Sequence, residues 1–349
     1  MSRFLHLVEL GIPLRHRFSN SMAAISERRV VLVGVTEDGS TGWGEAAPYP
    51  AYTLETVGDV WEALTTRGAR LLGSARAGLP ATAAAALEQA LADLAARRDG
   101  VPLWSYLGGS GGPSMACSAI GLEESPDLLV LRVERMSEAG AQQVKIKIEP
   151  GRDVDHVRAV RERFPGLTVA ADANGSYQLD NPSPAELDEL GLAYLEQPLP
   201  RRDLEGHARL RRQLATPICL DEPATSAAAV ERIIEHEAAD LVSLKPGILG
   251  PAATLRSIEM LSSAGIGAKI GGLVETSVGR AHALALASRP SVSYTDLVPP
   301  LWLLAADPSP HAWEVVDGLL FPLDERGVEV STAEPPLSDC VRRKAEFVL

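Results

Sequence analysis

Five charged residues recur at near-even intervals in the second half of the chain. They are Lys147, Asp172, Glu196, Asp221 and Lys245, and neighbouring members are 24 or 25 residues apart. Each of them follows or ends a short apolar run. A segment of that length accommodates one strand, one helix and two loops. The spacing therefore predicts one ionisable group per strand–helix unit, all at the same end of a parallel barrel, where active sites of this architecture form.

The pattern from residue 113 onward supports a barrel, because apolar runs alternate with helical segments. The eight expected strands are 115–121, 143–148, 167–172, 193–197, 218–221, 241–244, 266–271 and 292–297. The helices expected between them include 153–164, 226–235 and 252–264, with Ser226 as the N-cap of the second.

The remaining segments predict a second domain of the α+β class. Residues 3–45 have the pattern of antiparallel strands, and 54–72 and 81–94 that of helices. The glycine-rich run 108–113 lacks the Lys-Ser/Thr ending of a phosphate loop and is interpreted as a linker. We expect domains at 1–110 and 113–310, with a segment 311–349 that returns to the first domain through a strand-like stretch at 317–330.

Composition excludes several classes of function. A net charge of −13 over 349 residues argues against nucleic-acid binding, although it leaves an anionic small substrate possible. Three widely spaced cysteines, Cys117, Cys219 and Cys340, form neither a disulfide framework nor a metal pair. With no apolar run near 18 residues and no apolar signal segment, we expect a cytoplasmic protein without a membrane partner.

Alternation along residues 144–148 places two lysines inside the barrel. Side chains of a strand point alternately to opposite faces, so Val144, Ile146 and Ile148 face the helices while Lys145 and Lys147 face the interior. Buried ammonium groups require anions, and the next three strands supply them.

Those anions, Asp172, Glu196 and Asp221, form an all-oxygen set that favours Mg²⁺, or Mn²⁺, over zinc. Such an ion would stabilise an enediolate formed when a proton leaves the carbon beside a substrate carboxylate. Lys147 and Lys245 flank the set and are the candidate acid and base. We expect their pKa to be lowered by burial, by the ion and by a second cation; for Lys147 that cation is Lys145.

Six motifs resemble those of the enolase superfamily, in its muconate-lactonizing-enzyme subgroup. They are Lys145-Ile146-Lys147, Asp172-Ala173-Asn174, Glu196-Gln197-Pro198, Asp221-Glu222-Pro223, Lys245-Pro246 and Gly42-Trp43-Gly44-Glu45. The resemblance implies an α/β fold, a modified (β/α)₇β TIM barrel under an N-terminal α+β capping domain. It also implies Mg²⁺ on the three carboxylates, acid–base work by the two flanking lysines, and a homo-oligomer.

Within the subgroup, residues 271–276 and 278–281 resemble the seventh-strand segment of o-succinylbenzoate synthases and N-succinylamino acid racemases. Residues 18–21 and 49–56 resemble their capping loops. The glycines either let a succinyl arm pass close to the backbone or serve a tight turn. The candidate substrate contacts are Ser21, Tyr52, Asn174, Lys269, Gly271, Gly272 and Asp296.

Two positions depart from the synthase pattern. Lys269 stands where a large apolar residue is usual, and it either binds a distal carboxylate of the substrate or points outward into solvent. Asp296 resembles the first acid of the Asp-x-Asp pair of dipeptide epimerases, but Val298 takes the place of the second acid.

The resemblance implies a Mg²⁺-dependent lyase, an o-succinylbenzoate synthase of menaquinone biosynthesis. Its substrate would be a small carboxylate, 2-succinyl-6-hydroxy-2,4-cyclohexadiene-1-carboxylate. The alternative is an N-succinylamino acid racemase, with a dipeptide epimerase or muconate cycloisomerase less favoured. A binding protein that had lost the chemistry is disfavoured, because the full set of lysines and carboxylates is present.

Overall fold

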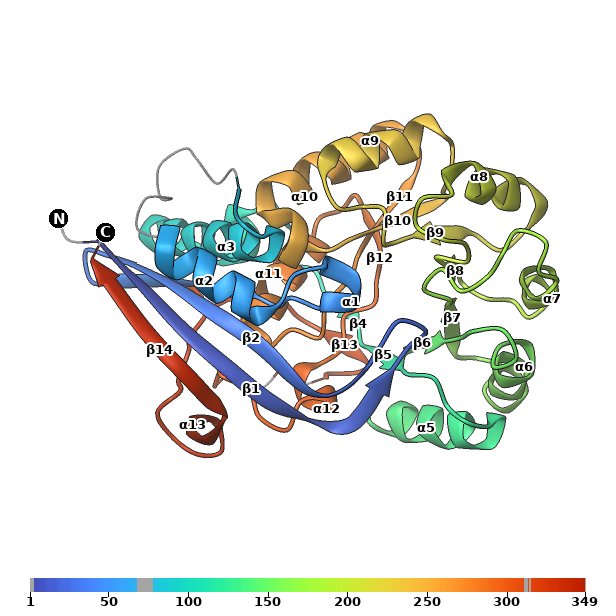
Figure 1. Ribbon diagram of the computed structural model, residues 1–349, viewed down its shortest axis with the longest axis horizontal. Coiled ribbons are helices and arrows are strands. Elements are labelled where there is room, and N and C mark those ends of the chain that lie inside the picture. Colours follow the sequence, from blue (N-terminus) through green and yellow to red (C-terminus); the bar gives the residue numbers. More distant parts are fainter. Residues whose placement is uncertain (1–2, 68–77, 311–312, 314, 349) are drawn as a thin grey trace.

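The computed structural model describes residues 3–67, 78–310, 313 and 315–348, and contains two main sheets (Figure 1). One is a four-stranded antiparallel sheet in the order β14-β1-β2-β3. The other has eight parallel strands in the order β12-β11-β10-β9-β8-β7-β6-β5. The predicted combination of a parallel barrel with a separate antiparallel domain is confirmed. Within the described ranges, no helix is both long enough and apolar enough to cross a bilayer.

The capping sheet and its helices come mostly from the N-terminal third. The strands are β1 (Arg3–Ser19), β2 (Ala24–Glu37) and β3 (Ser40–Ala46), and the helices are α1 (Pro50–Thr53), α2 (Val57–Arg67), α3 (Ala81–Asp99) and α4 (Leu103–Tyr106). The helix expected at 54–72 begins later, at Val57, and its last five expected residues lie outside the described part. Helix α3 packs so closely on β3 that a Cβ on Gly44 would lie 2.1 Å from the carbonyl oxygen of Ala86.

All eight expected barrel strands are present, β10 with the expected bounds and the other seven with shorter ones. They are β5 (Cys117–Ile120), β6 (Gln143–Lys147), β7 (Thr168–Asp172), β8 (Leu195–Glu196), β9 (Ile218–Leu220), β10 (Leu241–Leu244), β11 (Gly267–Ile270) and β12 (Val292–Thr295). The backbone N–H of Cys117 donates to the carbonyl of Leu297 at 3.3 Å, which links the first strand to the end of the eighth.

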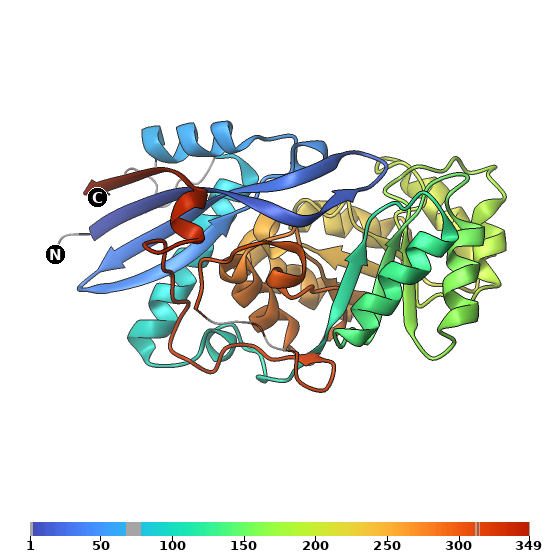
Figure 2. The ribbon, with the colours of Figure 1, turned by 90° about the horizontal axis from the view of Figure 1, so that it is seen from below.

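Helices surround the barrel strands, as the view from below shows (Figure 2). They are α5 (Pro126–Glu138), α6 (Val154–Arg163), α7 (Ser183–Asp188), α8 (Leu204–Gln213), α9 (Ala227–Glu235), α10 (Pro246–Ser263) and α11 (Ser277–Ala287). Ser226 caps α9 as expected, because its hydroxyl accepts from the N–H of Ala229 at 3.1 Å. Helix α10 starts six residues earlier than expected and is interrupted at Gly250, where φ is 74°.

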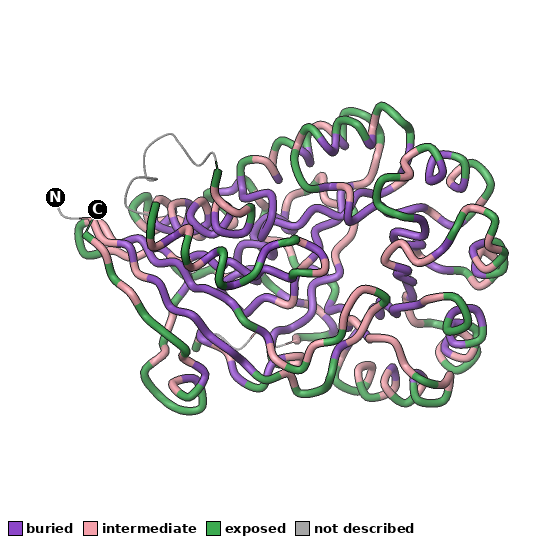
Figure 3. The backbone as a smooth tube through the Cα atoms, in the orientation of Figure 1, coloured by how far each residue is buried: buried purple, intermediate pink, exposed green. Residues whose placement is uncertain are grey.

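Burial follows the strand alternation. The barrel strands are largely buried, and the outer helices alternate between buried and exposed faces (Figure 3). Val144, Ile146 and Ile148 belong to the main apolar core between strands and helices. A separate small cluster inside the barrel contains Ala170, Tyr194, Cys219 and Leu241. The predicted division into outward apolar and inward functional positions is confirmed for these strands.

The C-terminal segment contains α12 (Pro300–Leu303), β13 (Leu319–Leu320), α13 (Leu337–Cys340) and β14 (Val341–Val348). The expectation of a strand over 317–330 is wrong, because only Leu319–Leu320 pairs, with β4 (Ser114–Met115). It is β14 that pairs with β1 in the capping sheet.

One carboxylate ties the capping sheet to the barrel. Glu45, near the end of β3, accepts from the N–H of Thr276 at 3.0 Å and from that of Gly279 at 2.9 Å, at the start of α11. Burial raises the pKa of Glu45 to about 7, although these hydrogen bonds oppose the shift. The capping domain is therefore held at the start of the helix that follows the seventh barrel strand.

Candidate active site

The sheet register aligns the predicted residues at the carboxyl ends of neighbouring strands. Lys147 is opposite Asp172, Asp172 is opposite Glu196, and Glu196 is opposite Cys219. Asp221 lies two residues beyond Cys219 and therefore on the same face. The even spacing in sequence thus becomes a row of ionisable groups along one end of the barrel.

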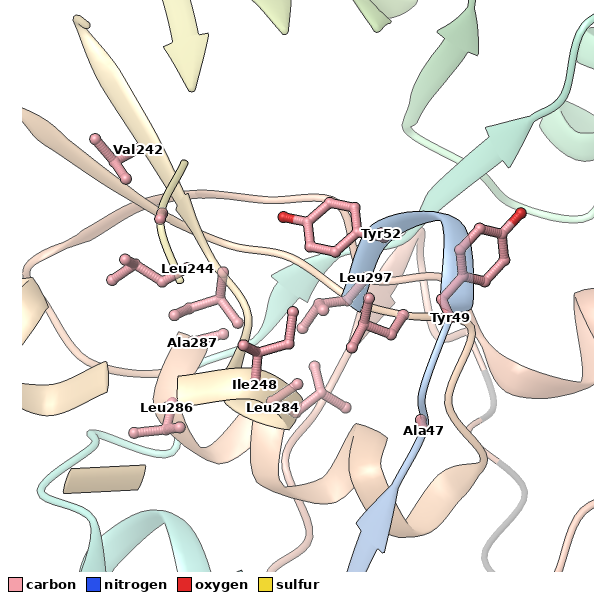
Figure 4. Packing of buried hydrophobic residues seen from close by; sticks show 14 of the residues in the cluster. Ala47, Tyr49, Tyr52, Val242, Leu244, Ile248, Leu284, Leu286, Ala287 and Leu297 are labelled. Carbon is pink, nitrogen blue, oxygen red and sulfur yellow. The ribbon is translucent and has the colours of Figure 1, made fainter. Parts of the chain in front are cut away.

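These groups meet beneath a cavity of about 80 Å³ that both domains line. The barrel contributes Lys145, Lys147, Asn174, Asp221, Lys245, Gly272 and Asp296; the capping domain contributes Phe18, Asn20, Met22, Tyr49 and Tyr52. In the apolar packing between the domains, the rings of Tyr49, the N-cap residue of α1, and of Tyr52, within α1, point in different directions (Figure 4). The Tyr52 ring lies 4.5 Å from Lys245 Nζ, so the capping domain covers one catalytic candidate directly.

Each carboxylate of the row is engaged by a lysine. Lys147 Nζ lies 2.5 Å from Asp172 Oδ2 and 2.9 Å from Asn174 Oδ1. The Lys245 ammonium donates a hydrogen bond to Asp221 Oδ1. Lys145 Nζ lies 3.1 Å from Glu196 Oε1. Four of the five lysines in the sequence are gathered here, which leaves Lys344 elsewhere.

Lys269 belongs to this network and lies deeper. It is 0% exposed, and its Nζ lies 2.5 Å from Glu196 Oε2 and 2.8 Å from Asp296 Oδ2. The alternative in which Lys269 points into solvent is therefore wrong: β11 turns it inward, where two carboxylates neutralise it. Its contact with substrate stays a prediction, although it is not among the residues that line the cavity.

Burial and ion pairing have opposite effects on the pKa of the groups in this network. Burial opposes ionisation of Asp172, but Lys147 and Lys145 outweigh it and lower its pKa. Burial works against the charged form of Lys245 too, yet Asp221 raises its pKa overall. The expected lowering is thus reversed for Lys245 in this arrangement, because a carboxylate rather than a cation is its nearest charged partner.

The donor set suits a divalent cation, since Asp172, Glu196 and Asp221 offer only buried oxygen atoms from adjacent strands. As they stand, these carboxylates face lysines, and no three acidic, His or Cys side chains in the described part of the chain converge on a common ion position. The chemistry of the residues fits Mg²⁺, and the same three would hold it.

The predicted substrate contacts divide into two groups. Tyr52, Asn174, Gly272 and Asp296 line the cavity. Ser21 and Gly271 do not. The Ser21 hydroxyl instead donates to the carbonyl of Ala173 at 3.4 Å. A Cβ on Gly271 would lie 2.7 Å from Ser243 Oγ, so its lack of a side chain serves close packing inside the protein.

Two buried residues next to the predicted ligands were not predicted as site residues. Gln197, at φ 41°, accepts from the N–H of Asp221 through its side chain at 3.0 Å and so positions that carboxylate. Glu222 accepts from Asn174 Nδ2 at 2.8 Å, and burial beside Asp221 raises its pKa to about 8. Each directly follows a residue of the row, Glu196 and Asp221 respectively, so strand alternation alone predicts that its side chain points away from the site.

Comparisons with known proteins agree with this arrangement. Residues 129–334 match the family described as "Enolase C-terminal domain-like", and residues 5–108 match "Mandelate racemase / muconate lactonizing enzyme, N-terminal domain". An N-succinylamino acid racemase of Thermus thermophilus is 38% identical over 80% of this chain and 81% of the relative. An o-succinylbenzoate synthase of Geobacillus kaustophilus is 36% identical over 81% of this chain and 80% of the relative.

The structure is also similar to that of an enolase superfamily member from Listeria innocua. The TM-score is 0.89 at 28% sequence identity, with 99% of each chain covered. Together with the two family matches, this similarity covers the capping domain and the barrel. The chain belongs to the enolase superfamily of enzymes, in the muconate-lactonizing-enzyme subgroup.

Proposed function

We propose that the protein is a Mg²⁺-dependent o-succinylbenzoate synthase, which removes water from 2-succinyl-6-hydroxy-2,4-cyclohexadiene-1-carboxylate. The observation that carries the proposal is the pair Lys147 and Lys245, which line one cavity from β6 and from the end of β10. The relatives named o-succinylbenzoate synthase, at 34–36% identity, support the choice of substrate.

In the proposed reaction, Lys147 as the free amine takes the proton from the carbon beside the ring carboxylate. The same ammonium then donates a proton to the departing hydroxyl, so that C–H and C–O bonds break, a ring double bond forms and water leaves. When bound by Asp172, Glu196 and Asp221, Mg²⁺ would stabilise the negative charge that develops on the substrate carboxylate. Lys245 supplies positive charge from the other side, under the Tyr52 ring.

The second candidate is an N-succinylamino acid racemase. Two lysines that line the same cavity can act on opposite faces of one carbon, one removing a proton while the other donates. The relative from Thermus thermophilus favours this activity. Both reactions begin with removal of a proton from the carbon beside a carboxylate, so one site can support both.

The test is the ultraviolet absorbance of the cyclohexadiene carboxylate incubated with the protein, first with Mg²⁺ and then with a chelator. Rapid loss of substrate that the chelator stops supports the synthase. No loss from well-folded protein with Mg²⁺ bound contradicts it. Solvent deuterium incorporation into N-succinylamino acids, measured in parallel, then decides whether the racemase takes its place.

A further inference from the structure

A second cavity adjoins the one above the lysines. Its volume is about 310 Å³, compared with about 80 Å³ for the space above the lysines. Phe18, Ala119 and Leu303 line both cavities, so the two spaces share a wall. The second cavity lies where the end of β1 meets β5, α5 and α12.

The smaller cavity is too small for a complete substrate of the proposed kind. Cavities that enclose a small organic ligand are typically about 300 Å³ or larger. A space of about 80 Å³ accommodates the reacting carbon and its carboxylate, but not a succinyl arm in addition. The adjoining cavity has the volume that the rest of such a substrate needs.

The second cavity is strongly basic, although the chain carries a net charge of −13. Five basic residues from β1 and α5 line it: Arg15, His16, Arg17, Arg132 and Arg135. Among its lining residues, Glu123 alone is acidic, and it is paired with Arg132 at 3.3 Å. One carboxylate therefore faces several cationic groups.

Most of this positive charge is not neutralised by the protein. Arg15 donates to the carbonyl groups of Leu301 and Leu304, which fix it without cancelling its charge. Within residues 3–67, 78–310, 313 and 315–348, the side chains of His16, Arg17 and Arg135 form no hydrogen bond or ion pair. Burial and the charges of Arg132 and Arg135 lower the pKa of His16, as expected where positive charge accumulates.

The other walls are apolar. Ile120, Met136 and Trp302 line the cavity, together with Phe18, Ala119 and Leu303 of the shared wall. A ligand that fills it would therefore have an apolar segment that ends in an anion. A succinyl arm, with two methylene groups and a terminal carboxylate, has this chemistry.

We propose that this basic cavity is the second half of the substrate site. It receives the far end of the substrate, and Arg17 and Arg135 select for a carboxylate there. The inference rests on the proposed function and deepens it, because it makes the terminal charge of the acyl arm, rather than its length, the feature that the protein recognises.

The test compares two ligands that differ only in that charge: the N-succinyl and N-succinamoyl derivatives of one amino acid. Their affinities are measured by calorimetry with Mg²⁺ for the wild type, the double variant Arg17→Gln/Arg135→Gln and the control Arg209→Gln. Arg209 is an exposed arginine on α8 that lines neither cavity. Circular dichroism checks folding, and the single variant Arg135→Gln replaces the double variant if the latter unfolds.

We expect the wild type and Arg209→Gln to bind the succinyl ligand about tenfold more tightly, as two partly exposed ion pairs would allow, with the ratio near one in the double variant. Equal affinities in the wild type, or a ratio that the double variant leaves unchanged, would overturn the proposal. Binding needs no turnover. A charge preference without any turnover would reject the proposed function and leave the basic cavity supported.

Discussion

Lys147 and Asp172 are opposite one another across β6 and β7, and the Lys147 ammonium lies 2.5 Å from Asp172 Oδ2. The candidate base and the candidate metal ligand are thus direct neighbours. A similar contact joins Lys245 to Asp221, although the register of β9 and β10 does not place these two residues opposite one another.

Removal of either flanking lysine should abolish proton transfer. We expect Lys147→Ala and Lys245→Ala to lower solvent deuterium incorporation at the carbon beside the substrate carboxylate by about 10³-fold or more. The first variant lacks the proposed base, and the second lacks the positive charge opposite it, which in the racemase would be the second acid or base. Lys344→Ala is the matched control, since Lys344 is exposed in β14. Near-normal exchange in both site variants would remove the lysines from the mechanism.

Neutralising one carboxylate should weaken ion binding. Asp221→Asn replaces an anionic oxygen donor with a neutral one, and we expect Mg²⁺ affinity measured by calorimetry to fall about tenfold or more. Asp155→Asn, at an exposed position on α6, controls for the change in net charge. Unchanged affinity in Asp221→Asn would show that the ion binds elsewhere.

Lys269 should stabilise the folded protein. Lys269→Met leaves Glu196 and Asp296 buried with fewer positive partners, and we expect urea unfolding to show a loss of about 3–5 kcal/mol. In the double variant Lys269→Met/Asp296→Asn, one of the two carboxylates is neutral, so part of the loss should be recovered. Wild-type stability of Lys269→Met would mean that these ion pairs contribute no net stabilisation.

Glu45 should make stability depend on pH. Its pKa rises from 4.5 in the unfolded chain to about 7 in the fold because burial disfavours the carboxylate. Its contribution to stability is therefore fully present below about pH 4.5 and is lost as the pH rises through about 7. The free energy of unfolding changes by on the order of 3 kcal/mol over this range.

The measurement compares Glu45→Gln with the wild type by urea unfolding between pH 5 and pH 8. We expect the stability of the wild type relative to Glu45→Gln to fall as the pH rises across this range. Glu138→Gln, at an exposed position on α5, should show no such trend. A difference that is constant with pH would contradict the raised pKa of Glu45.

Close packing of α3 on β3 should make Gly44 irreplaceable. A Cβ there would lie 2.1 Å from the backbone oxygen of Ala86, and a backbone atom in a helix cannot move aside cheaply. We expect Gly44→Ala to lower the free energy of unfolding by about 3 kcal/mol or more. In the control Gly166→Ala, the added Cβ meets nothing within 4 Å; equal losses in the two variants would refute the packing argument.

The sequence by itself determined the barrel and its reactive end. Strand alternation is a local property of the backbone, so the pattern around Lys147 was enough to assign which side chains face inward. The even spacing of Asp172, Glu196 and Asp221 likewise follows from the length of a strand–helix unit.

Only the tertiary structure decided which residues from distant segments meet. Lys269 and Glu196 are 73 residues apart, and their ion pair depends on where β11 and β8 lie in the barrel. The strand that returns to the capping domain is β14 rather than residues 317–330. Strand β14 lies at the edge of the sheet, and most of its residues are exposed. Because several of them are charged, its sequence lacks the regular apolar alternation by which a strand is recognised. Tyr52 lines the candidate active-site cavity, and Phe18 lines both this cavity and the basic one. Both placements result from the docking of the two domains, which no local sequence pattern predicts.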